Sequence, residues 1–577
     1  MKFLLAAFSA LLLLSGCASS IYQADISAIE KVPADHGFVA VSVVNNVEIL
    51  APLHPNWNQV WMVRIDNRDA KKAEAIAKAR AKGVKRPDDE IDYDLDIYTL
   101  SPIAAGAISS QSFLGSMPAG EYRIGLLYSF YSDGNMSSSL SMQVGLSTGT
   151  FTVATNTLTE LGSIVFQPLL TVSSPSFWTT SGAQNAYVTR GGKLTDLRRF
   201  ALESYPKLAT RLIDDVQIGW DSDDAKTEQL RADLYQLSRA NAFSNIPHRL
   251  TRYGKGAVTG RFGLLHYLDS DANWHTESLP TDGQLAALLE MPNEVIVGGE
   301  FGALFAAPSL AGPWQPIEAV NTRESIVWLA AGKTTNYALT QSAETFYLYR
   351  FDDIRSTWRR MHSLERKKSI WTGDDEILPF LTSDGGARIL VGNKVHSFHP
   401  DTHALTITPA VEELIKFAAL GQGSLVGLQT SLWDGIGDQV VSIDDGASWR
   451  VFKRRLNIIG DNKADASLPT RLADGRFVTL GRRDAAGAGD DALYIVTAAA
   501  EQLTNREKHQ YHGVTQTSCE TLLAPLTHDN TLYFLCDQGG IIRTADLGQN
   551  YETLTTIDTA SMQLRFLELL LLLGLEQ

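Results

Sequence analysis

Five aromatic residues recur at regular intervals over the second half of the chain. They are Trp274, Trp314, Trp358, Trp449 and Tyr551, and the gaps between them are 40, 44, 91 and 102 residues. Because the last two gaps are about twice the first two, one further unit fits into each, near Leu405 and near Leu503. Five marked units and two inserted units give about seven repeats of roughly 40 to 54 residues. A repeat of this size predicts units of about four strands each, stacked side by side.

A short motif ends at two of these aromatic residues. Its members are Ser442, Asp444, Gly446 and Trp449 in one copy, and Thr544, Asp546, Gly548 and Tyr551 in the other. The pattern suits a hairpin turn, because the aspartate can accept backbone N–H groups, the glycine can take a positive φ, and the aromatic ring can pack between sheets. Less complete copies lie at 268–274, 307–314 and 352–358.

The motif S-x-D-x-G-x-[S/T]-W resembles the Asp box of the BNR repeats found in sialidases and related β-propellers. This resemblance implies that residues 246–577 form a β-propeller. The repeat count predicts seven blades, with six or eight as the alternatives. We therefore expect a mainly β chain, in which an N-terminal β-sandwich and a short helical linker precede the propeller.

The apolar C-terminal stretch 562–573 follows the last aromatic marker at the place where the inner strand of the next blade would start. We expect it to complete the first blade, because the roughly 30 residues that separate the linker helices from Trp274 are few for three strands. A buried C-terminal helix is the alternative. The stretch is too short to favour a membrane segment.

The first seventeen residues have the pattern of a bacterial lipoprotein signal. A positive start precedes an apolar run that is too short to span a bilayer, and Leu14, Ser15 and Gly16 then precede Cys17. These four residues resemble a lipobox, which implies that residues 1–16 are removed and that the Cys17 thiol is diacylated. An ordinary signal peptide with a chance cysteine is the alternative.

The residue after the cysteine bears on the location of the protein. Ala18 is similar to the residue at this position in lipoproteins that are sorted to the outer membrane. We therefore expect an outer-membrane lipoprotein of the cell envelope that faces the periplasm or the cell surface, with residues 17–37 as its tether.

The other two cysteines flank a predicted hairpin. Apolar runs on either side of the turn residues 528–530 would pair as antiparallel strands and bring Cys519 opposite Cys536. In a chain exported to an oxidising compartment, this placement predicts a disulfide, which would stabilise the fold by about 3 kcal/mol. Two buried free thiols are the alternative.

Residues 38–170 contain short β-rich runs separated by turns, which predicts a β-sandwich. The stretch 117–123 resembles the P-x-G-x-Y turn and strand of prealbumin-like and carboxypeptidase-regulatory-like sandwiches, which usually act as accessory or adhesion modules. A charged insertion at 69–96 interrupts this part with a helical pattern of Ala, Lys and Arg. Its alternating carboxylates lack the glycine and distal glutamate of a Ca²⁺ loop, so a solvated surface is favoured over a metal site.

Residues 171–245 are expected to form a helical linker. Two apolar stripes at helical spacing lie there, one from Leu194 to Leu212 and one from Leu230 to Leu237. Such stripes usually belong to the core, so the linker helices should pack the sandwich against the propeller.

The charge of the chain limits its partners. With 65 Asp and Glu against 50 Lys and Arg, the chain is acidic and would be repelled by nucleic acid and by anionic headgroups. Membrane association is therefore expected from the lipid alone. The histidines at 396, 399 and 403 would point to different sides of a strand-turn-strand unit, so we expect no metal there and no cofactor.

The sequence favours binding over catalysis. The only near match to the (F/Y)-R-I-P motif of sialidases is 122–125, which lacks the proline and lies outside the propeller. We expect the propeller to be a non-catalytic binding or assembly platform for a protein or glycan. A sialidase-like glycoside hydrolase is the alternative, with carboxylates drawn from Glu300, Asp374, Asp375 and Glu376. An envelope structural component without a diffusible ligand is a third possibility.

Overall fold

The computed structural model describes the greater part of the chain. The described residues are 21–24, 26, 28–46, 56–132, 137–171, 184–192, 197–213, 219–240, 257–271, 273–366, 368–369, 373–374, 377–421, 423–429, 437–453, 467–482, 492–516, 518–536 and 540–574. Leu14, Ser15, Gly16 and Cys17 lie outside these residues. Lipidation of Cys17 therefore stays a prediction.

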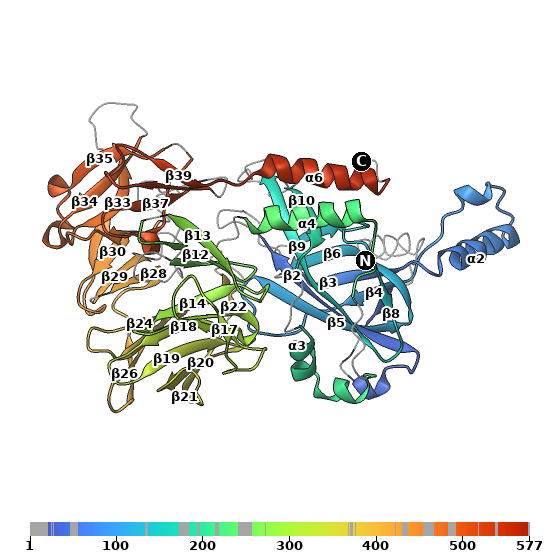
Figure 1. Cartoon of the computed structure of the whole chain (residues 1–577), viewed down its shortest axis with the longest axis horizontal. Helices are drawn as coiled ribbons and strands as arrows, with labels where there is room; N and C mark the ends of the chain where they lie inside the picture. Colours follow the sequence, from blue (N-terminus) through green and yellow to red (C-terminus); the bar gives the residue numbers. More distant parts are fainter. Residues whose placement is uncertain are drawn as a thin grey trace, which may run out of the picture.

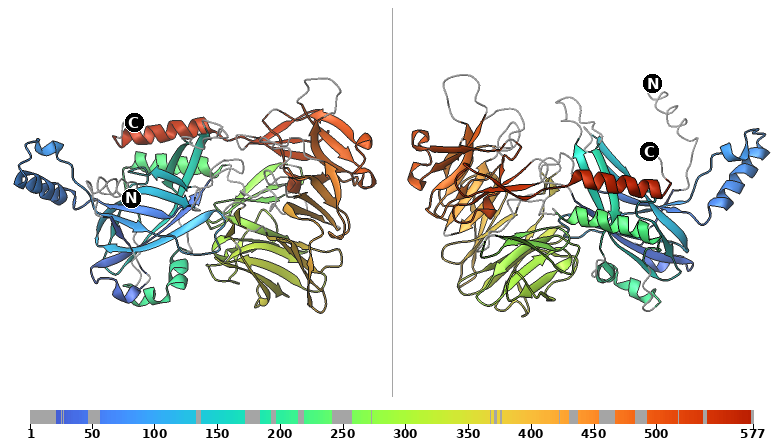
Figure 2. Two further views of the ribbon diagram at one scale, coloured as in Figure 1. Left: turned by 180° about the vertical axis from the view of Figure 1, so that it is seen from behind. Right: turned by 45° about the horizontal axis from the view of Figure 1, so that its top comes forward.

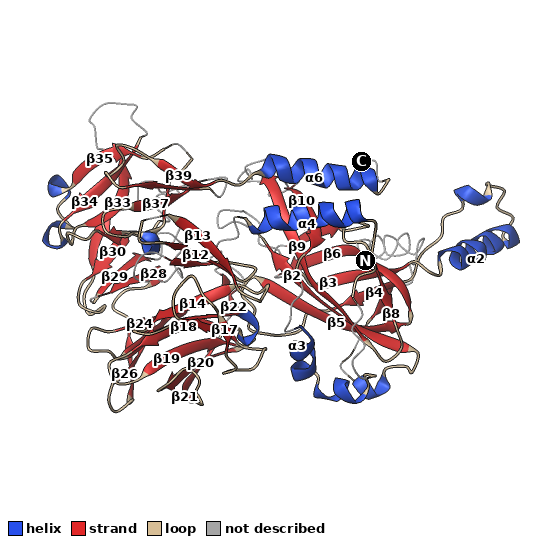
Figure 3. Ribbon diagram, in the orientation of Figure 1, coloured by secondary structure: helices blue, strands red, loops and turns tan. Residues whose placement is uncertain are grey.

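The N-terminal part is a sandwich of two β-sheets (Figures 1 and 3). The first sheet contains β1 (Ile21–Gln23), β4 (Ile97–Leu100), β3 (Gln59–Arg64), β6 (Gly120–Ser132) and β7 (Ser137–Gln143) in that order, with β8 (Thr150–Val153) also paired to β6. The second sheet has the order β10 (Gln184–Arg190), β9 (Leu158–Thr171), β2 (His36–Asn45) and β5 (Ser110–Pro118). β2 runs parallel to β9 and antiparallel to β5.

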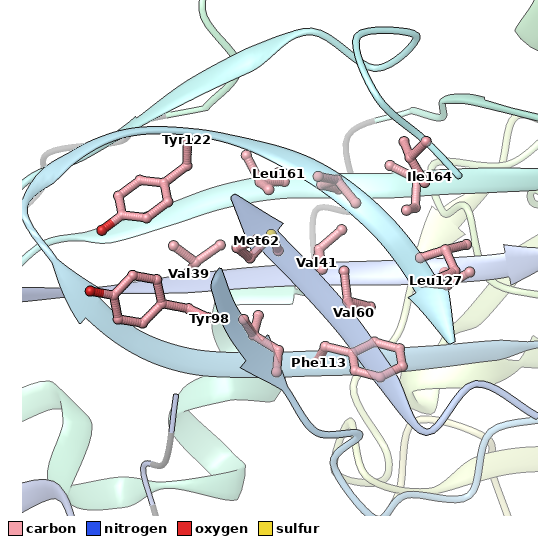
Figure 4. Close-up of a cluster of buried hydrophobic side chains, with 14 of the residues drawn as sticks. Val39, Val41, Val60, Met62, Tyr98, Phe113, Tyr122, Leu127, Leu161 and Ile164 are labelled. Atoms are coloured by element: carbon pink, nitrogen blue, oxygen red, sulfur yellow. The ribbon is translucent and has the colours of Figure 1, made fainter. Parts of the chain in front are cut away.

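Alternating residues of β2 divide between two cores. Val39 and Val41 are fully buried between the two sheets, among the side chains drawn in Figure 4. Phe38 and Ala40 point to the other face of the same strand, where they pack against a helix. Both faces of β2 are therefore covered, which explains why its sequence is almost continuously apolar.

The sandwich is larger than the sequence predicted. β1 lies within the segment expected to be a tether and pairs with β4, while β10 lies within the segment expected to be a helical linker and pairs with β9. β1 is three residues long and exposed, and β10 carries a β-bulge, so neither has a clear period of its own. β1 and β10 are strands because each pairs with a longer neighbouring strand, β4 and β9 respectively.

The charged insertion forms helix α2 (Arg68–Ala81), none of whose residues is buried. It projects from the sandwich on the side away from the propeller (Figures 1 and 2). The base of the helix is held by an ion pair between Lys71 Nζ and Asp96 Oδ1 at 2.8 Å and by a hydrogen bond from Arg68 Nε to the Tyr93 hydroxyl at 2.7 Å.

Successive antiparallel sheets follow and form a β-propeller (Figure 1). A three-stranded sheet comes first, and four-stranded sheets follow it. Their strands are β11 (Ala257–Thr259), β12 (Leu264–Leu268), β13 (Trp274–Ser278); β14 (Leu285–Glu290), β15 (Val295–Gly299), β16 (Leu304–Ala307), β17 (Gln315–Pro316); β18 (Ser325–Ala331), β19 (Asn336–Gln341), β20 (Thr345–Phe351), β21 (Arg359–Glu365); β24 (Ile377–Leu381), β25 (Ala387–Val391), β26 (Lys394–Phe398), β27 (Leu405–Pro409); β28 (Leu414–Gly421), β29 (Ser424–Gln429), β30 (Gln439–Ser442), β31 (Arg450–Lys453); β32 (Thr470–Arg471), β33 (Phe477–Arg482), β34 (Leu493–Ala498), β35 (Gln510–Val514); and β36 (Thr521–Leu522), β37 (Leu532–Leu535), β38 (Ile541–Thr544), β39 (Glu552–Thr555). A separate pair, β22 (Lys368–Ser369) and β23 (Gly373–Asp374), lies between the third and fourth of these sheets in the chain.

The ring closes between its first and last sheets. Val258 and Leu268 of the first sheet share a buried cluster with Tyr533 and Leu535 of the last. In several of the sheets, the first strand also contacts the first strand of the next, so the first strands line the centre and the last strands form the rim. The described sheets fit a seven-fold ring, and the blade number itself stays a prediction.

The prediction that 562–573 completes the first blade is wrong. This stretch belongs to α6 (Thr559–Leu572), which leaves the propeller and lies beside α4 (Ala225–Arg239) on the sandwich (Figure 2). Met562, Phe566 and Leu569 face α4, at the i, i+4, i+7 spacing of a helix. Leucine, glutamine, glutamate and arginine are good helix formers, so local propensity and the apolar spacing agree. Among the described helices, none is long and apolar enough to cross a membrane.

Helices α3 and α4 join the two parts. In α3 (Leu197–Ser204), Phe200 packs on Phe38 and Ala40 of β2 and meets the ring of Phe301, which follows β15, edge to face at 5.5 Å. In α4, Leu230 and Leu234 pack on the sandwich and on α6. Phe200 of α3 therefore contacts both the sandwich and the propeller, whereas the apolar stripe of α4 packs between the sandwich and α6.

The predicted disulfide is present. Cys519 and Cys536 are bonded, with their Cα atoms 3.8 Å apart, at the ends of the hairpin that β36 and β37 form. The disulfide links the first two strands of the last sheet, which is also the sheet that packs against the first one to close the ring.

Replacing both cysteines by serine is expected to lower the free energy of unfolding by about 3 kcal/mol, because the unfolded chain regains the entropy of an open loop. Urea unfolding with and without a thiol reductant measures this difference. The double variant should not respond to the reductant, and an equal response from both proteins would contradict the prediction.

A buried histidine makes the propeller sensitive to acid. His266 in β12 is 1% exposed, stacks on Trp274 at 5.7 Å, and lies 2.9 Å from the Thr276 hydroxyl. Burial lowers its pKa to about 3, whereas the unfolded chain titrates at the ordinary value near 6.5. Below pH 6.5, the imidazole is therefore protonated in the unfolded state and neutral in the folded state. The free energy of unfolding falls by about 1.4 kcal/mol for each pH unit down to the folded pKa.

Replacing His266 by phenylalanine is expected to remove this part of the acid sensitivity. The exposed Thr276 hydroxyl can bond to water in the variant. Chemical unfolding at pH 7.0, 6.0 and 5.0 measures the slope of stability against pH in both proteins. Equal slopes for wild type and His266→Phe would contradict a lowered pKa of His266 in the folded state.

Candidate functional site

Two turns of the propeller share one pattern of hydrogen bonds. At 442–449, the Asp444 carboxylate accepts from the Ser448 N–H at 2.8 Å, and the Gly446 N–H donates to the Ser442 hydroxyl at 2.9 Å. At 544–551, Asp546 accepts from the Asn550 N–H at 2.9 Å, and the Gly548 N–H donates to the Thr544 hydroxyl, also at 2.9 Å. Hydrogen bonds from the Asn550 backbone and side chain lower the pKa of Asp546 to about 2.

Each turn needs its glycine. Gly446 has a φ of 82° and Gly548 a φ of 88°, a region that glycine adopts without strain. Both turns join the third and fourth strands of their sheets. Their aspartates accept backbone N–H groups of their own turns, so both aspartates hold the turn backbone in place. The membership of both turns in the Asp-box class stays a prediction.

The aromatic residue that ends such a turn packs toward the preceding sheet. Trp358 does so completely: it is 7% exposed, stacks on Phe351 at 5.0 Å, and belongs to the core shared with the second sheet of the propeller. Trp449 is only partly buried, with its ring 6.1 Å from that of Phe417. Trp358 fills the space between its sheet and the preceding one. Trp449 fills the corresponding space between the sheets β24–β27 and β28–β31 only in part.

A cavity of about 350 Å³ occupies this space, between the sheets β24–β27 and β28–β31. Phe380, Leu390 and Phe417 line it from the shared core, and Trp449 lines it from the turn. Its volume lies within the range of ligand-binding pockets. Most lining residues are apolar, so the site could hold an apolar side chain or small ligand. Its polar lining residues, which could orient a ligand, are Arg388, Ser397, Thr406, Thr408, Glu412 and Asp445.

Charged groups lie at the mouth of this cavity. Asp445, at a φ of 57°, accepts from the Ser383 hydroxyl at 2.6 Å and from the Ser383 N–H, which ties the two sheets together. Arg388 donates to the Asp445 carbonyl at 2.7 Å. Glu412 lies in the connection from β27 to β28 and accepts from the Gln429 amide at 2.8 Å. The sequence did not indicate these residues, because sheet stacking assembles them from four segments.

A second cavity of about 520 Å³ lies at the seam where the ring closes. Asp269 and Ser270 line it from the first sheet, and Asp546, Tyr551 and Arg543 from the last. Its carboxylates have local partners: His275 and the Asn273 amides bond to Asp269, and Arg543 pairs with Glu552. A larger share of its lining residues is polar or charged than in the first cavity, and Tyr533 and Tyr551 are its aromatic lining residues.

Glu300, one of the proposed catalytic carboxylates, has a structural role instead. It is 1% exposed and accepts the N–H groups of Ile108, Ser109 and Ser110 of the sandwich at 2.5, 2.7 and 3.0 Å. Its second oxygen accepts the Gln284 N–H at 2.7 Å. A carboxylate so fully engaged by backbone amides is not available for acid–base chemistry. Asp375 and Glu376 lie outside the described residues, as does the side chain of Asp374.

Other candidates from the sequence are also separated in space. Residues 122–125 form part of β6 in the sandwich, so Arg123 cannot belong to a propeller site. His396 is buried beside His362, with ring centres 5.4 Å apart, whereas His399 accepts the N–H of Asp401 in the following turn. Within the described ranges, no group of three or more His, Cys, Asp or Glu side chains could hold a metal ion.

Comparisons with known proteins add little beyond the fold. No family model and no curated protein matches the chain. A 6-phosphogluconolactonase-like protein from Bacteroides uniformis is 12% identical over 54% of this chain and 96% of its own, with a TM-score of 0.34. YCF48 bound to D1 peptide is 14% identical over 55% of this chain and 85% of its own, with a TM-score of 0.27. YCF48 from Cyanidioschyzon merolae is 11% identical over 52% and 80%, with a TM-score of 0.26. Likenesses of this size leave the function open.

Proposed function

We propose that this chain is a lipid-anchored envelope protein whose propeller is a non-catalytic platform for a protein partner. The observation that carries the proposal is the cavity at Trp449, which lies between two blades and is lined by the aromatic rings of Phe380, Phe417 and Trp449. Figure 1 shows β26, in the sheet that forms one wall of this cavity, at the end of the propeller away from the sandwich. A partner bound there would not compete with the sandwich for space.

The contacts between sandwich and propeller support a rigid platform. Asp282, before β14, accepts from the Ser163 hydroxyl at 2.7 Å and from the Tyr235 hydroxyl at 2.9 Å. Thr322, before β18, donates its N–H to Glu203 of α3 at 2.7 Å. Together with Glu300, these bonds join the sandwich side to successive propeller sheets. Buried polar contacts of this kind fix one orientation, because misaligned groups would lose their partners.

The lipid on Cys17 would attach the protein to the membrane. The lipobox at 14–17 precedes β1 by only four residues, so an acylated Cys17 would hold the sandwich close to the bilayer. The propeller, on the far side of the sandwich from α2, would then carry the binding surface.

Mass spectrometry of the mature protein tests this function. The N-terminal peptide should begin at Cys17 and carry acyl chains, and the native envelope should yield one stoichiometric protein crosslinked to the propeller. A Cys17→Ser variant should lose the acyl mass and the membrane fraction, while keeping its fold. An unmodified Cys17, or capture of glycan without protein, would contradict the proposal.

A further inference from the structure

We propose that the cavity at Trp449 and the neighbouring edge strand β27 bind an extended peptide segment of the partner, which adds a strand to the sheet β24–β27. This inference rests on the proposed function, since it names the chemistry of the partner that the platform holds. Three observations carry it: the composition of β27, its open edge, and the position of the cavity beside it.

β27 differs in charge from the rim strands β21, β31 and β39, and it is longer than the uncharged two-residue rim strand β17. All five of its residues, Leu-Thr-Ile-Thr-Pro, are exposed and uncharged. By contrast, β21 begins with two arginines, β31 contains Arg450 and Lys453, and β39 begins with Glu552. Charged residues on an edge strand discourage another strand from pairing with it. β27 has no charged residue, and its one other protective residue is Pro409 at its end, which offers no backbone N–H.

The free edge of β27 has no strand paired to it within the part of the chain that the structure describes. Among the described residues, no hydrogen bond from outside its sheet reaches the backbone of 405–409. The uncharged rim strand β35 is different, because the neighbouring turn covers it: the Gly513 N–H donates to the Leu547 carbonyl and the Tyr551 hydroxyl donates to the Val514 carbonyl. An exposed row of backbone donors and acceptors is a template for an extended peptide.

The cavity gives such a peptide a reason to bind in one register. Thr406 and Thr408 line the cavity, whereas Leu405 and Ile407 alternate to the other face of the strand. In an added strand, every second side chain would likewise lie on the cavity side. One of these side chains could enter the cavity between Trp449 and Phe417. A bulky apolar group there would displace water from the two aromatic rings.

Apolar and acidic groups around the strand define the rest of the peptide. Ile407, in the middle of β27, is 50% exposed, and Val411, two residues beyond its end, is 61% exposed, so both offer apolar area to a ligand. Glu412 lines the cavity and Glu413 is exposed next to it. The matching ligand is an extended segment rich in β-branched residues, with one bulky apolar side chain and a basic residue at one end.

A synthetic peptide tests the proposal directly. The probe is a fluorescein-labelled octapeptide, Lys-Thr-Val-Thr-Leu-Thr-Val-Lys, whose binding to the full chain is followed by fluorescence anisotropy. It carries lysine at both ends so that a basic residue can lie near Glu412 and Glu413 in either strand direction. Replacing its leucine by alanine should weaken binding by at least tenfold in the wild type. In a Ser397→Phe variant, which fills the cavity, the leucine and alanine peptides should bind equally.

Backbone methylation separates strand addition from simple apolar contact. Methylating one alternate set of peptide nitrogens should abolish binding, and methylating the other set should leave it unchanged, because only one set faces β27. The Ile407→Lys variant should bind at least tenfold more weakly. Val514→Lys is the matched control, since Val514 is 42% exposed at the end of the covered rim strand β35, and it should bind as the wild type does.

Several results would overturn the inference. They are the absence of binding at 1 mM peptide, equal binding by both methylated peptides, and unchanged binding by Ile407→Lys. A concentration-dependent dimer that Ile407→Lys abolishes would assign the edge to a second copy of this chain instead. If Ile407→Lys keeps the stoichiometric partner that the wild type captures in the envelope, the platform function stands and the strand-addition site is wrong.

Discussion

Replacing Glu300 by alanine is expected to lower the free energy of unfolding by about 4 kcal/mol or more. The carboxylate accepts four backbone N–H groups, three from the sandwich and one from Gln284. Each buried donor left without an acceptor costs about 1–3 kcal/mol. Because these amides lie on both sides of the junction, the loss should also separate the unfolding of the sandwich from that of the propeller.

Calorimetry and urea unfolding with two probes measure both effects. The wild type should unfold in one transition and Glu300→Ala in two. The matched control is Glu318→Gln, at the same junction, where an 82% exposed side chain pairs with Arg199. An exposed ion pair contributes less than about 1 kcal/mol, so this variant should unfold as the wild type does. Equal effects of the two substitutions would show that Glu300 does not join the two parts.

The second large effect is expected in α6. Replacing Leu569 by alanine should cost about 2–5 kcal/mol, because its fully buried side chain packs among Leu230, Leu234 and Tyr187 and its removal leaves a cavity. Leu571 is 69% exposed on the same helix, so Leu571→Ala should change stability by less than about 0.5 kcal/mol.

This pair of variants also separates the helix from the strand that the sequence suggested. In a β-strand, residues 569 and 571 would share one face and both substitutions would have similar effects. In a helix they lie on opposite sides. Urea unfolding of both variants decides the matter, and a comparable loss for Leu571→Ala would contradict the position of α6.

Features that depend on short-range patterns could be predicted from the sequence. The aromatic spacing gave the propeller, and the turn chemistry of Asp444 and Gly446 gave a hairpin of the observed kind. The disulfide followed from the symmetry of Cys519 and Cys536 about a turn. For the turn and the disulfide, the residues that decide the structure lie within about 20 positions of one another, where local geometry limits the alternatives. The propeller followed instead from a repeat that recurs along half of the chain.

Features that depend on long-range packing could not be predicted. The 562–573 stretch suits either a buried strand or a buried helix, and its partner α4 lies more than 300 residues earlier in the chain. Glu300 was a catalytic candidate because it is a carboxylate in the propeller. Only its hydrogen bonds with the backbone of 108–110 show its structural role. The cavity at Trp449 likewise depends on how two sheets stack, which no single segment encodes.

We propose that the propeller end with β27 holds a protein partner while an acylated Cys17 holds the chain at the membrane. The most direct measurement places a photoreactive benzoylphenylalanine at Val411, beside the cavity, and in a second protein at Leu571, on the exposed side of α6. After irradiation in the native envelope, Val411 should crosslink to one protein in stoichiometric amount and Leu571 should not. Crosslinking of that protein at Leu571 alone, or of no protein at either position, would contradict the account.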